Sequence, residues 1–152
     1  MTPAHRSLSE EVAGLLLELN TGLRAHFAAS AERLGLSPAQ AKVLGILESP
    51  RPQREIARTL DVDASYVTAI VDQLGKLSLV ERRPDPGDRR VKWIHLTARG
   101  RRAKARFEEL LYSELPGAAG MDDGELAVLR DHLRRMLDRM RTTSQIVDPI
   151  NI

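Results

Sequence analysis

An acidic residue followed by two arginines, Asp88-Arg89-Arg90, is the most specific chemical feature of the chain. A guanidinium group is permanently charged, and its planar fork suits phosphate oxygens and the negative potential of a narrow DNA minor groove. Asp88 can pair with Arg90, two residues on, and orient its long side chain, although an exposed pair of this kind is worth only about 0–1 kcal/mol. The tripeptide therefore predicts a tip that binds a polyanion.

Positive charge is concentrated around this tip. Residues 82–106 hold ten Lys or Arg and two Asp, a net charge of +8, whereas the whole chain carries only +2. A dense basic block on a nearly neutral chain is typical of proteins that bind nucleic acid. The alternative is a basic surface that only faces solvent.

Residues that carry catalysis or hold metals are sparse. The chain has no cysteine, its four histidines lack metal-ligand spacing, and no glycine-rich phosphate loop is present. The acidic group Asp122, Asp123 and Glu125 is explained by the start of a helix, where the helix dipole favours negative charge. We therefore expect no enzymatic activity, no cofactor and no metal site.

The composition indicates an aliphatic, mostly helical core. Only 3% of the residues are aromatic although 42% are hydrophobic, and 152 residues fit one domain. No run of about 18 apolar residues is present, and residues 1–9 lack the pattern of a secretory signal. We expect a single cytoplasmic domain, residues 1–152.

Apolar periodicity and turn residues predict a mainly α fold with a small β-hairpin wing (α+β) and six helices. The helices are expected near residues 9–33, 37–48, 53–60, 63–77, 97–115 and 122–142, and the strands near 79–83 and 91–96. Residues 49–52 and 61–63 are predicted turns. Capping residues are expected at the start of five helices: Ser7 with Glu10, Ser37 with Gln40, Asp63, Thr97, and Asp122 with Glu125.

Two short helices joined by a three-residue turn and followed by a hairpin match a winged helix-turn-helix. A major groove about 12 Å wide admits the second helix, and the hairpin reaches the neighbouring minor groove. The alternatives are an ordinary amphipathic helix, whose outer face is polar in any case, and a winged helix whose basic face binds an acidic protein. The candidate DNA contacts are the outward residues of this helix and the hairpin: Ser65, Tyr66, Thr68, Ala69, Gln73, Lys76, Arg82, Arg83, Asp88, Arg89, Arg90 and Lys92.

Five segments carry a family resemblance: Leu60-Asp61-Val62-Asp63, Val67-Thr68-Ala69-Ile70-Val71-Asp72-Gln73-Leu74, Leu79-Val80-Glu81-Arg82-Arg83, Asp85-Pro86-Gly87-Asp88-Arg89-Arg90 and Leu96-Thr97-Ala98-Arg99-Gly100. Over about residues 37–102 the chain resembles the MarR family of transcription regulators. The resemblance implies a winged helix-turn-helix at 37–100, with the helix-turn-helix at 53–77 and the wing at 79–97, between dimerisation helices at 7–34 and 101–143. It also implies a homodimer on a palindromic double-stranded DNA operator, in most members a repressor. A further alternative to a sequence-specific regulator is an architectural protein that binds DNA without sequence specificity.

The chain departs from the family pattern around the recognition helix. Ser78 stands where glycine is usual, at a position that requires a left-handed backbone. Ala69 and Gln73 stand where arginines are usual, and Tyr66 is larger than the residue expected there. We therefore expect an operator that differs from those of better-known members.

The first and last helices would be poorly covered in a monomer, because the first is long and the last has an apolar stripe from Leu126 to Met140. Pairing with a second chain would bury both, and a two-fold dimer suits paired half-sites about one helical turn apart. The alternative is that these helices pack within one chain. We expect a homodimer.

The resemblance further implies that a small aromatic or lipophilic effector releases the repressor from DNA, as in many members, by binding between the dimer helices and the winged part. The candidates by position are His26, Phe27, Trp93 and Phe107. The alternative is that Phe27 and Phe107 belong to the core and that Trp93 packs on the face of the hairpin.

Overall fold

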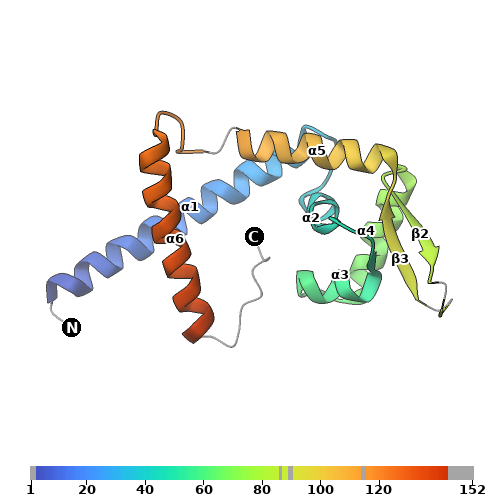
Figure 1. Cartoon of the computed structure of the whole chain (residues 1–152), viewed down its shortest axis with the longest axis horizontal. Helices are drawn as coiled ribbons and strands as arrows, with labels where there is room; N and C mark the ends of the chain where they lie inside the picture. The colour runs from blue at the N-terminus through green and yellow to red at the C-terminus, as the bar shows by residue number, and fades with distance from the viewer. Residues whose placement is uncertain (1–2, 86, 89–90, 114–115, 144–152) are drawn as a thin grey trace.

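The computed structural model describes residues 3–85, 87–88, 91–113 and 116–143. In this part of the chain the elements are α1 (Pro3–Glu32), α2 (Pro38–Ile46), β1 (Arg51–Pro52), α3 (Gln53–Leu60), α4 (Ala64–Lys76), β2 (Val80–Pro84), β3 (Lys92–Leu96), α5 (Ala98–Ser113) and α6 (Asp123–Thr143). The helices α2, α3 and α4 form a lobe with the small sheet, and α1 extends far beyond it (Figure 1). The predicted mainly α fold with six helices and a β wing is confirmed.

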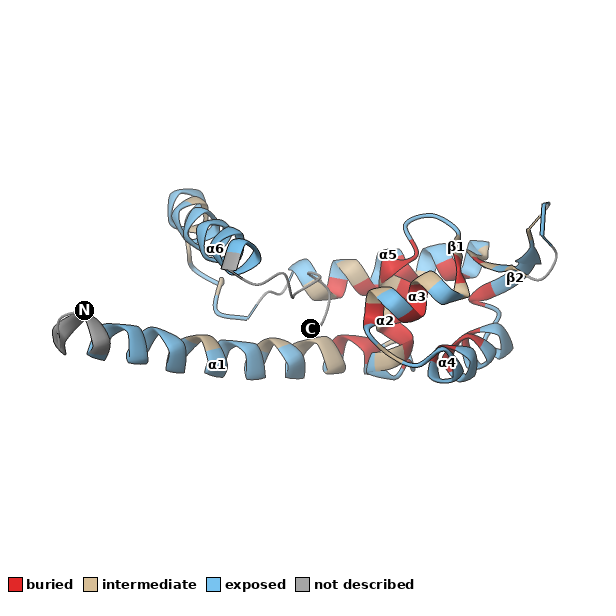
Figure 2. Ribbon diagram, turned by 90° about the horizontal axis from the view of Figure 1, so that it is seen from below, coloured by how far each residue is buried: buried red, intermediate tan, exposed pale blue. Residues whose placement is uncertain are grey.

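The hydrophobic core lies in this lobe and in the parts of α1 and α5 that pack on it (Figure 2). The apolar residues that recur at helical spacing in α2, α3 and α4 are buried there, and each buried Val, Leu or Ile side chain contributes about 1.5–3 kcal/mol by leaving water. The largest fully buried side chains are those of Phe107, Leu44, Leu47, Ile56, Leu74, Ile94, Val43, Val67 and Val71. No helix in the described ranges is long and apolar enough to cross a bilayer.

The first helix begins earlier than expected. α1 starts at Pro3, so Ser7 and Glu10 lie inside the helix and the capping box predicted there is wrong. Proline is favoured at a helix start, because the N–H that it lacks has no partner in the first turn. At the other end, α1 is followed by Gly35, whose φ is +67°.

Two of the predicted capping boxes are confirmed. At the start of α2, Ser37 Oγ accepts from the Gln40 N–H at 3.2 Å, and Gln40 Oε1 accepts from the Ser37 N–H at 2.8 Å. Asp122 and Glu125 make the same reciprocal pair at the start of α6. Asp63 is the N-cap residue of α4, but its side chain makes no capping hydrogen bond, so the prediction of a side-chain cap is wrong.

The strands form a three-stranded antiparallel sheet in the order β1-β3-β2. β2 and β3 are the predicted hairpin, with Arg82 opposite Ile94. On the other side of β3, Arg51 and Pro52 pair with Ile94 and Trp93, where a turn was predicted. A two-residue strand has no periodicity to detect, and Pro52 is tolerated because an edge strand does not need its missing N–H.

The Leu-Thr-x-x-Gly segment joins the wing to α5. The Thr97 N–H donates to the Leu79 carbonyl at 3.0 Å, and Thr97 Oγ1 accepts from the Gly100 N–H at 2.9 Å, which confirms the predicted cap. A β-carbon on Gly100 would lie 1.9 Å from the Leu79 carbonyl oxygen. Ser78, just before Leu79, has φ of +57°, the left-handed backbone expected there. Only glycine therefore lets α5 approach this turn so closely.

Candidate nucleic-acid interface

The outer face of α4 is the first part of the interface. Val67, Ile70, Val71 and Leu74 anchor one side of the helix in the core, because they recur at helical spacing. The opposite side is exposed along its length and carries all the predicted α4 contacts together with one acid: Ser65, Tyr66, Thr68, Ala69, Asp72, Gln73 and Lys76. This face has the dimensions and polarity of a helix that enters a major groove.

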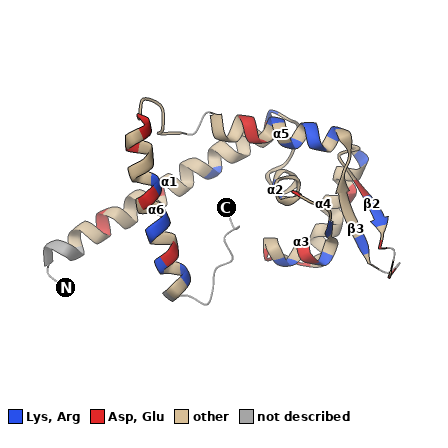
Figure 3. Cartoon of the chain, viewed as in Figure 1, with Lys and Arg blue, Asp and Glu red and all other residues tan. Residues whose placement is uncertain are grey.

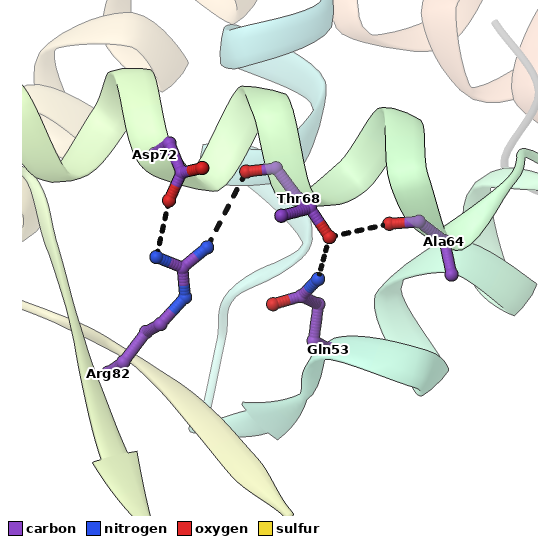
Figure 4. A network of polar contacts seen from close by, with 5 residues as sticks. All are labelled: Gln53, Ala64, Thr68, Asp72 and Arg82. Carbon is purple, nitrogen blue, oxygen red and sulfur yellow. Dashed lines mark hydrogen bonds and ion pairs between the residues drawn. The ribbon is translucent and has the colours of Figure 1, made fainter.

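Arg82 of the wing is bonded to this helix (Figure 4). Its Nη1 lies 2.5 Å from Asp72 Oδ1, and its Nη2 donates to the Thr68 carbonyl at 3.5 Å. The Thr68 hydroxyl in turn accepts from Gln53 Nε2 of α3 and donates to the Ala64 carbonyl. Arg82 is thus a bridge between β2 and α4, which fixes the wing relative to the recognition helix.

A carboxylate shapes the turn of the wing. Asp85 Oδ1 accepts from the N–H groups of Gly87 at 2.7 Å and Asp88 at 3.0 Å, and its Oδ2 accepts from Trp93 Nε1 at 2.8 Å. These hydrogen bonds lower the pKa of Asp85, the backbone donors contributing most. Asp85 was not among the predicted site residues, although an Asp before Pro-Gly is typical of a side-chain-stabilised turn. Arg89 and Arg90 lie outside the described residues, so the pairing of Asp88 with Arg90 stays a prediction.

The described residues of the basic block are divided between the wing strands and α5 (Figure 3). Two predicted DNA contacts, Arg83 on β2 and Lys92 on β3, are exposed. Arg83 also forms an ion pair with Glu81 at 2.5 Å. Lys104 is buried, with its side chain 10% exposed, and donates to the Gly45 carbonyl, Glu48 and Glu108. The inference that the whole block from 82 to 106 faces a polyanion is therefore wrong for Lys104.

The pKa values of Lys104 and Glu48 follow from this pairing. Burial alone would lower the pKa of Lys104, but its hydrogen bonds to Glu108 and Glu48 and their charges raise it overall. The same hydrogen bond lowers the pKa of Glu48, with a smaller contribution from the charge of Arg51. The charged Lys104 side chain therefore links α5 to the C-terminal end of α2.

A cleft of about 510 Å³ opens between α1, α2 and α5. Phe27 and Phe107 are among its lining residues and meet edge to face, with ring centroids 5.1 Å apart. His26 and Trp93 are not among the lining residues. His26 Nε2 lies 3.1 Å from the Leu111 carbonyl oxygen, and Trp93 donates to Asp85 in the wing. The structure brings together two of the four predicted effector residues, and Phe107 is also part of the core, as the alternative had it.

The charges around the cleft are unequal. Its lining includes Lys42, Arg51, Glu48 and Glu108, and both acids are already paired with Lys104. When Lys104 is counted with these four residues, the cleft and its immediate surroundings hold three positively and two negatively charged side chains. Within the described ranges, no group of three or more His, Cys, Asp or Glu side chains could hold a metal ion.

Comparisons with known proteins agree with this geometry. A family model described as MarR family matches residues 34–91. The helix-turn-helix transcriptional regulator YcgE of Bacillus subtilis (strain 168) is 30% identical over 136 residues, which are 88% of each chain. This chain belongs to the MarR family.

Solved structures of MarR-family proteins have the same architecture. The apo form of wild-type MarR from E. coli is 26% identical, with a TM-score of 0.70, over 82% of this chain and 95% of that one. CouR from Rhodococcus jostii RHA1, bound to p-coumaroyl-CoA, is 28% identical, with a TM-score of 0.67, over 85% of this chain and 93% of that one. As a MarR-family protein, the chain is a helix-turn-helix transcription regulator and not an enzyme.

Proposed function

We propose that this MarR-family protein is a homodimeric repressor that binds a palindromic operator through α4 and the wing, and that a small anionic amphipathic ligand releases it. The observation that carries the proposal is the bridge from Arg82 to Asp72 and Thr68. It holds the wing and the exposed face of α4 in one rigid arrangement, as a unit that enters two neighbouring grooves requires. The twelve candidate contacts of this surface stay as proposed DNA contacts.

Exposed apolar side chains support the homodimer. None of the residues of α6 whose burial is described is buried, and α6 stands apart from the lobe (Figure 2). The exposed large apolar residues of α1 and α6 are Leu8, Val12, Leu15, Leu17, Leu19, Val128, Leu129, Leu133, Met136, Leu137 and Met140. Monomeric proteins rarely leave so many large apolar side chains exposed on two helices. A second copy of the chain is the partner that would cover them, because binding to a two-fold symmetric operator requires a two-fold dimer.

The cleft supports the effector. Its volume and its aromatic wall at Phe27 and Phe107 suit a small aromatic ligand, and the excess positive charge from Lys42 and Arg51 suits an acid. α2 lines the cleft and packs on α4. A ligand that displaces α2 would therefore change the position of the recognition helix.

Gel shifts on DNA from upstream of the gene test the DNA-binding part of the proposal. We expect specific binding that weakens steeply between about 50 and 200 mM salt, because phosphate contacts release counterions. Arg90→Ala should lower the affinity about tenfold or more, since a minor-groove arginine contributes to specific binding. Arg134→Ala, which removes the same charge from α6, is the matched control.

The other outcomes of this experiment point to the alternatives. Binding of equal strength to any DNA would indicate an architectural protein, and no binding would indicate a protein-interaction module. An unchanged affinity of the Arg90→Ala variant would contradict the role of the wing.

Ligand release is tested with pairs of small aromatic acids and their uncharged amides. We expect acids to raise Tm and to dissociate the DNA complex more than the amides, and Lys42→Gln to reduce this difference. Equal effects of acid and amide would contradict the charge argument, and no effect of any pair would contradict the effector. Trp93 lies in the wing, so its fluorescence does not report directly on the cleft.

A further inference from the structure

A short chain of hydrogen bonds runs from the start of α2 to the recognition helix. The Ser37 N–H donates to Gln40 Oε1 at 2.8 Å, and Gln40 Nε2 donates to Gln73 Oε1 at 2.9 Å. Gln40 is 9% exposed, whereas Gln73 lies on the exposed side of α4. A buried amide on α2 therefore contacts an exposed amide on the proposed DNA-binding surface.

The direction of these hydrogen bonds follows from the backbone. A backbone N–H can only donate, so the end of the Gln40 amide that faces Ser37 must be its oxygen. The NH2 group of Gln40 then faces Gln73, and the end of the Gln73 amide that meets it must be an oxygen, because an amide NH2 group does not accept a hydrogen bond. The capping box of α2 thus determines which way round the Gln73 amide lies.

The consequence for DNA is a restriction on what Gln73 can contact. A free glutamine can bind adenine through both ends of its amide, accepting from the base amino group and donating to N7. In this protein Gln40 occupies one of the two acceptor sites of the Gln73 oxygen, and the NH2 group of Gln73 is the end turned away from Gln40. That group donates to acceptors, which on DNA are phosphate oxygens, adenine N7, thymine O4 and the N7 and O6 atoms of guanine. Guanine suits it best among the purines, because its major-groove edge carries two acceptors, whereas adenine N7 lies beside a donor.

We propose that Gln40 is a positioning residue that fixes the orientation of the Gln73 amide and makes Gln73 a hydrogen-bond donor toward DNA, so that its NH2 group contacts guanine or a phosphate. The inference rests on the proposed DNA-binding function. It gives a role to Gln73, which stands where an arginine is usual in the family. An arginine there is also a donor, so the pair of amides preserves the polarity of the contact while removing its charge.

Gln40→Glu is the decisive variant. The substituted carboxylate keeps the acceptor for the Ser37 N–H and so retains the capping box. Its second oxygen cannot donate, so the Gln73 amide should turn over, donate to this oxygen and present its own oxygen to DNA. The Gln73 oxygen would then face an acceptor on guanine or a phosphate, and two acceptors cannot form a hydrogen bond. We therefore expect the affinity for the selected operator to fall by about tenfold or more.

A double-mutant cycle separates this effect from the added negative charge. Gln73→Met removes the amide at similar length, and in this background Gln40→Glu can act only through its charge and its local effect on α2. We expect Gln40→Glu to cost about tenfold in the wild-type background and no more than about threefold in the Gln73→Met background. Equal costs in the two backgrounds would overturn the inference.

Selection of operators from random DNA identifies the acceptor. If Gln73 contacts guanine, Gln40→Glu should change the preferred base at one position in each half-site to adenine or cytosine, whose amino groups donate. If it contacts a phosphate, the preferred sequence should stay the same while the affinity falls. A wild-type protein that already selects adenine through an amide that accepts from its amino group would also overturn the inference. Absence of specific DNA binding by the wild type would instead overturn the proposed function, and this inference with it.

Discussion

Arg82 and Asp72 form an ion pair between the wing and the recognition helix, with 2.5 Å between Nη1 and Oδ1. Asp72 lies on the exposed face of α4, where an unpaired carboxylate would repel phosphate. Pairing removes this repulsion and at the same time fixes the wing strand to the helix. Arg82, a predicted DNA contact, therefore acts on the surface through Asp72 and not only through its own charge.

Removal of this pair should affect DNA binding more than stability. Both side chains are partly exposed, at 35% and 49%, so we expect Arg82→Met and Asp72→Asn each to change the free energy of unfolding by less than about 1 kcal/mol. Operator affinity should fall about fivefold in either variant, because the wing is no longer held at its angle to α4. The double variant should cost no more than the more affected single variant, and additive losses measured by gel shift would contradict a shared structural role.

Gly100→Ala should destabilise the fold strongly. The added β-carbon would overlap the Leu79 carbonyl oxygen, so either α5 or the turn after α4 must move. We expect a loss of about 2–4 kcal/mol in the free energy of unfolding by urea, similar to other overpacking changes in a core. Gly14→Ala, in α1 with open space around the glycine, is the control and should be neutral or slightly stabilising. A Gly100→Ala variant as stable as the control would show that this junction is not rigid.

Leu133→Arg should dissociate the proposed homodimer. Leu133 lies on the exposed apolar stripe of α6, and a buried arginine without a partner is costly at an interface. Sedimentation should show a monomer, with loss of operator binding. Asp131→Arg introduces the same side chain on the opposite face of α6 and should remain a dimer. A dimeric Leu133→Arg variant would place the interface elsewhere.

The wing should respond to acid through Asp85. Its pKa is below the ordinary value of 3.8 because the charged form accepts the backbone and indole hydrogen bonds, so the stabilisation is present above the unfolded-state pKa and is lost as the pH falls through the folded-state pKa. We expect the fluorescence of Trp93, the single tryptophan, to change only below pH 3.8. Asp85→Asn removes the ionisable group and should lack this transition. An identical titration of the Asn variant would assign the change to general acid unfolding, and far-UV circular dichroism provides the comparison.

The sequence by itself determined the elements whose specifying interactions are local. The capping boxes at Ser37 with Gln40 and at Asp122 with Glu125 join residues three apart, and the inward faces of α2, α3 and α4 repeat every three or four residues. Such spacings are visible in the chain because the helix geometry itself brings the residues together. The family motif around the wing was visible because its residues are consecutive in the chain, although its two arginines lie outside the described residues.

Only the tertiary structure decided the partners of the charged and polar groups. Arg82 pairs with a residue 10 positions away, Lys104 with one 56 positions away, and Gln40 with one 33 positions away. β1 likewise exists only because β3 passes beside it. A charged side chain has the same sequence signature whether it faces solvent, a buried acid or DNA, because its state depends on which distant groups the fold places beside it.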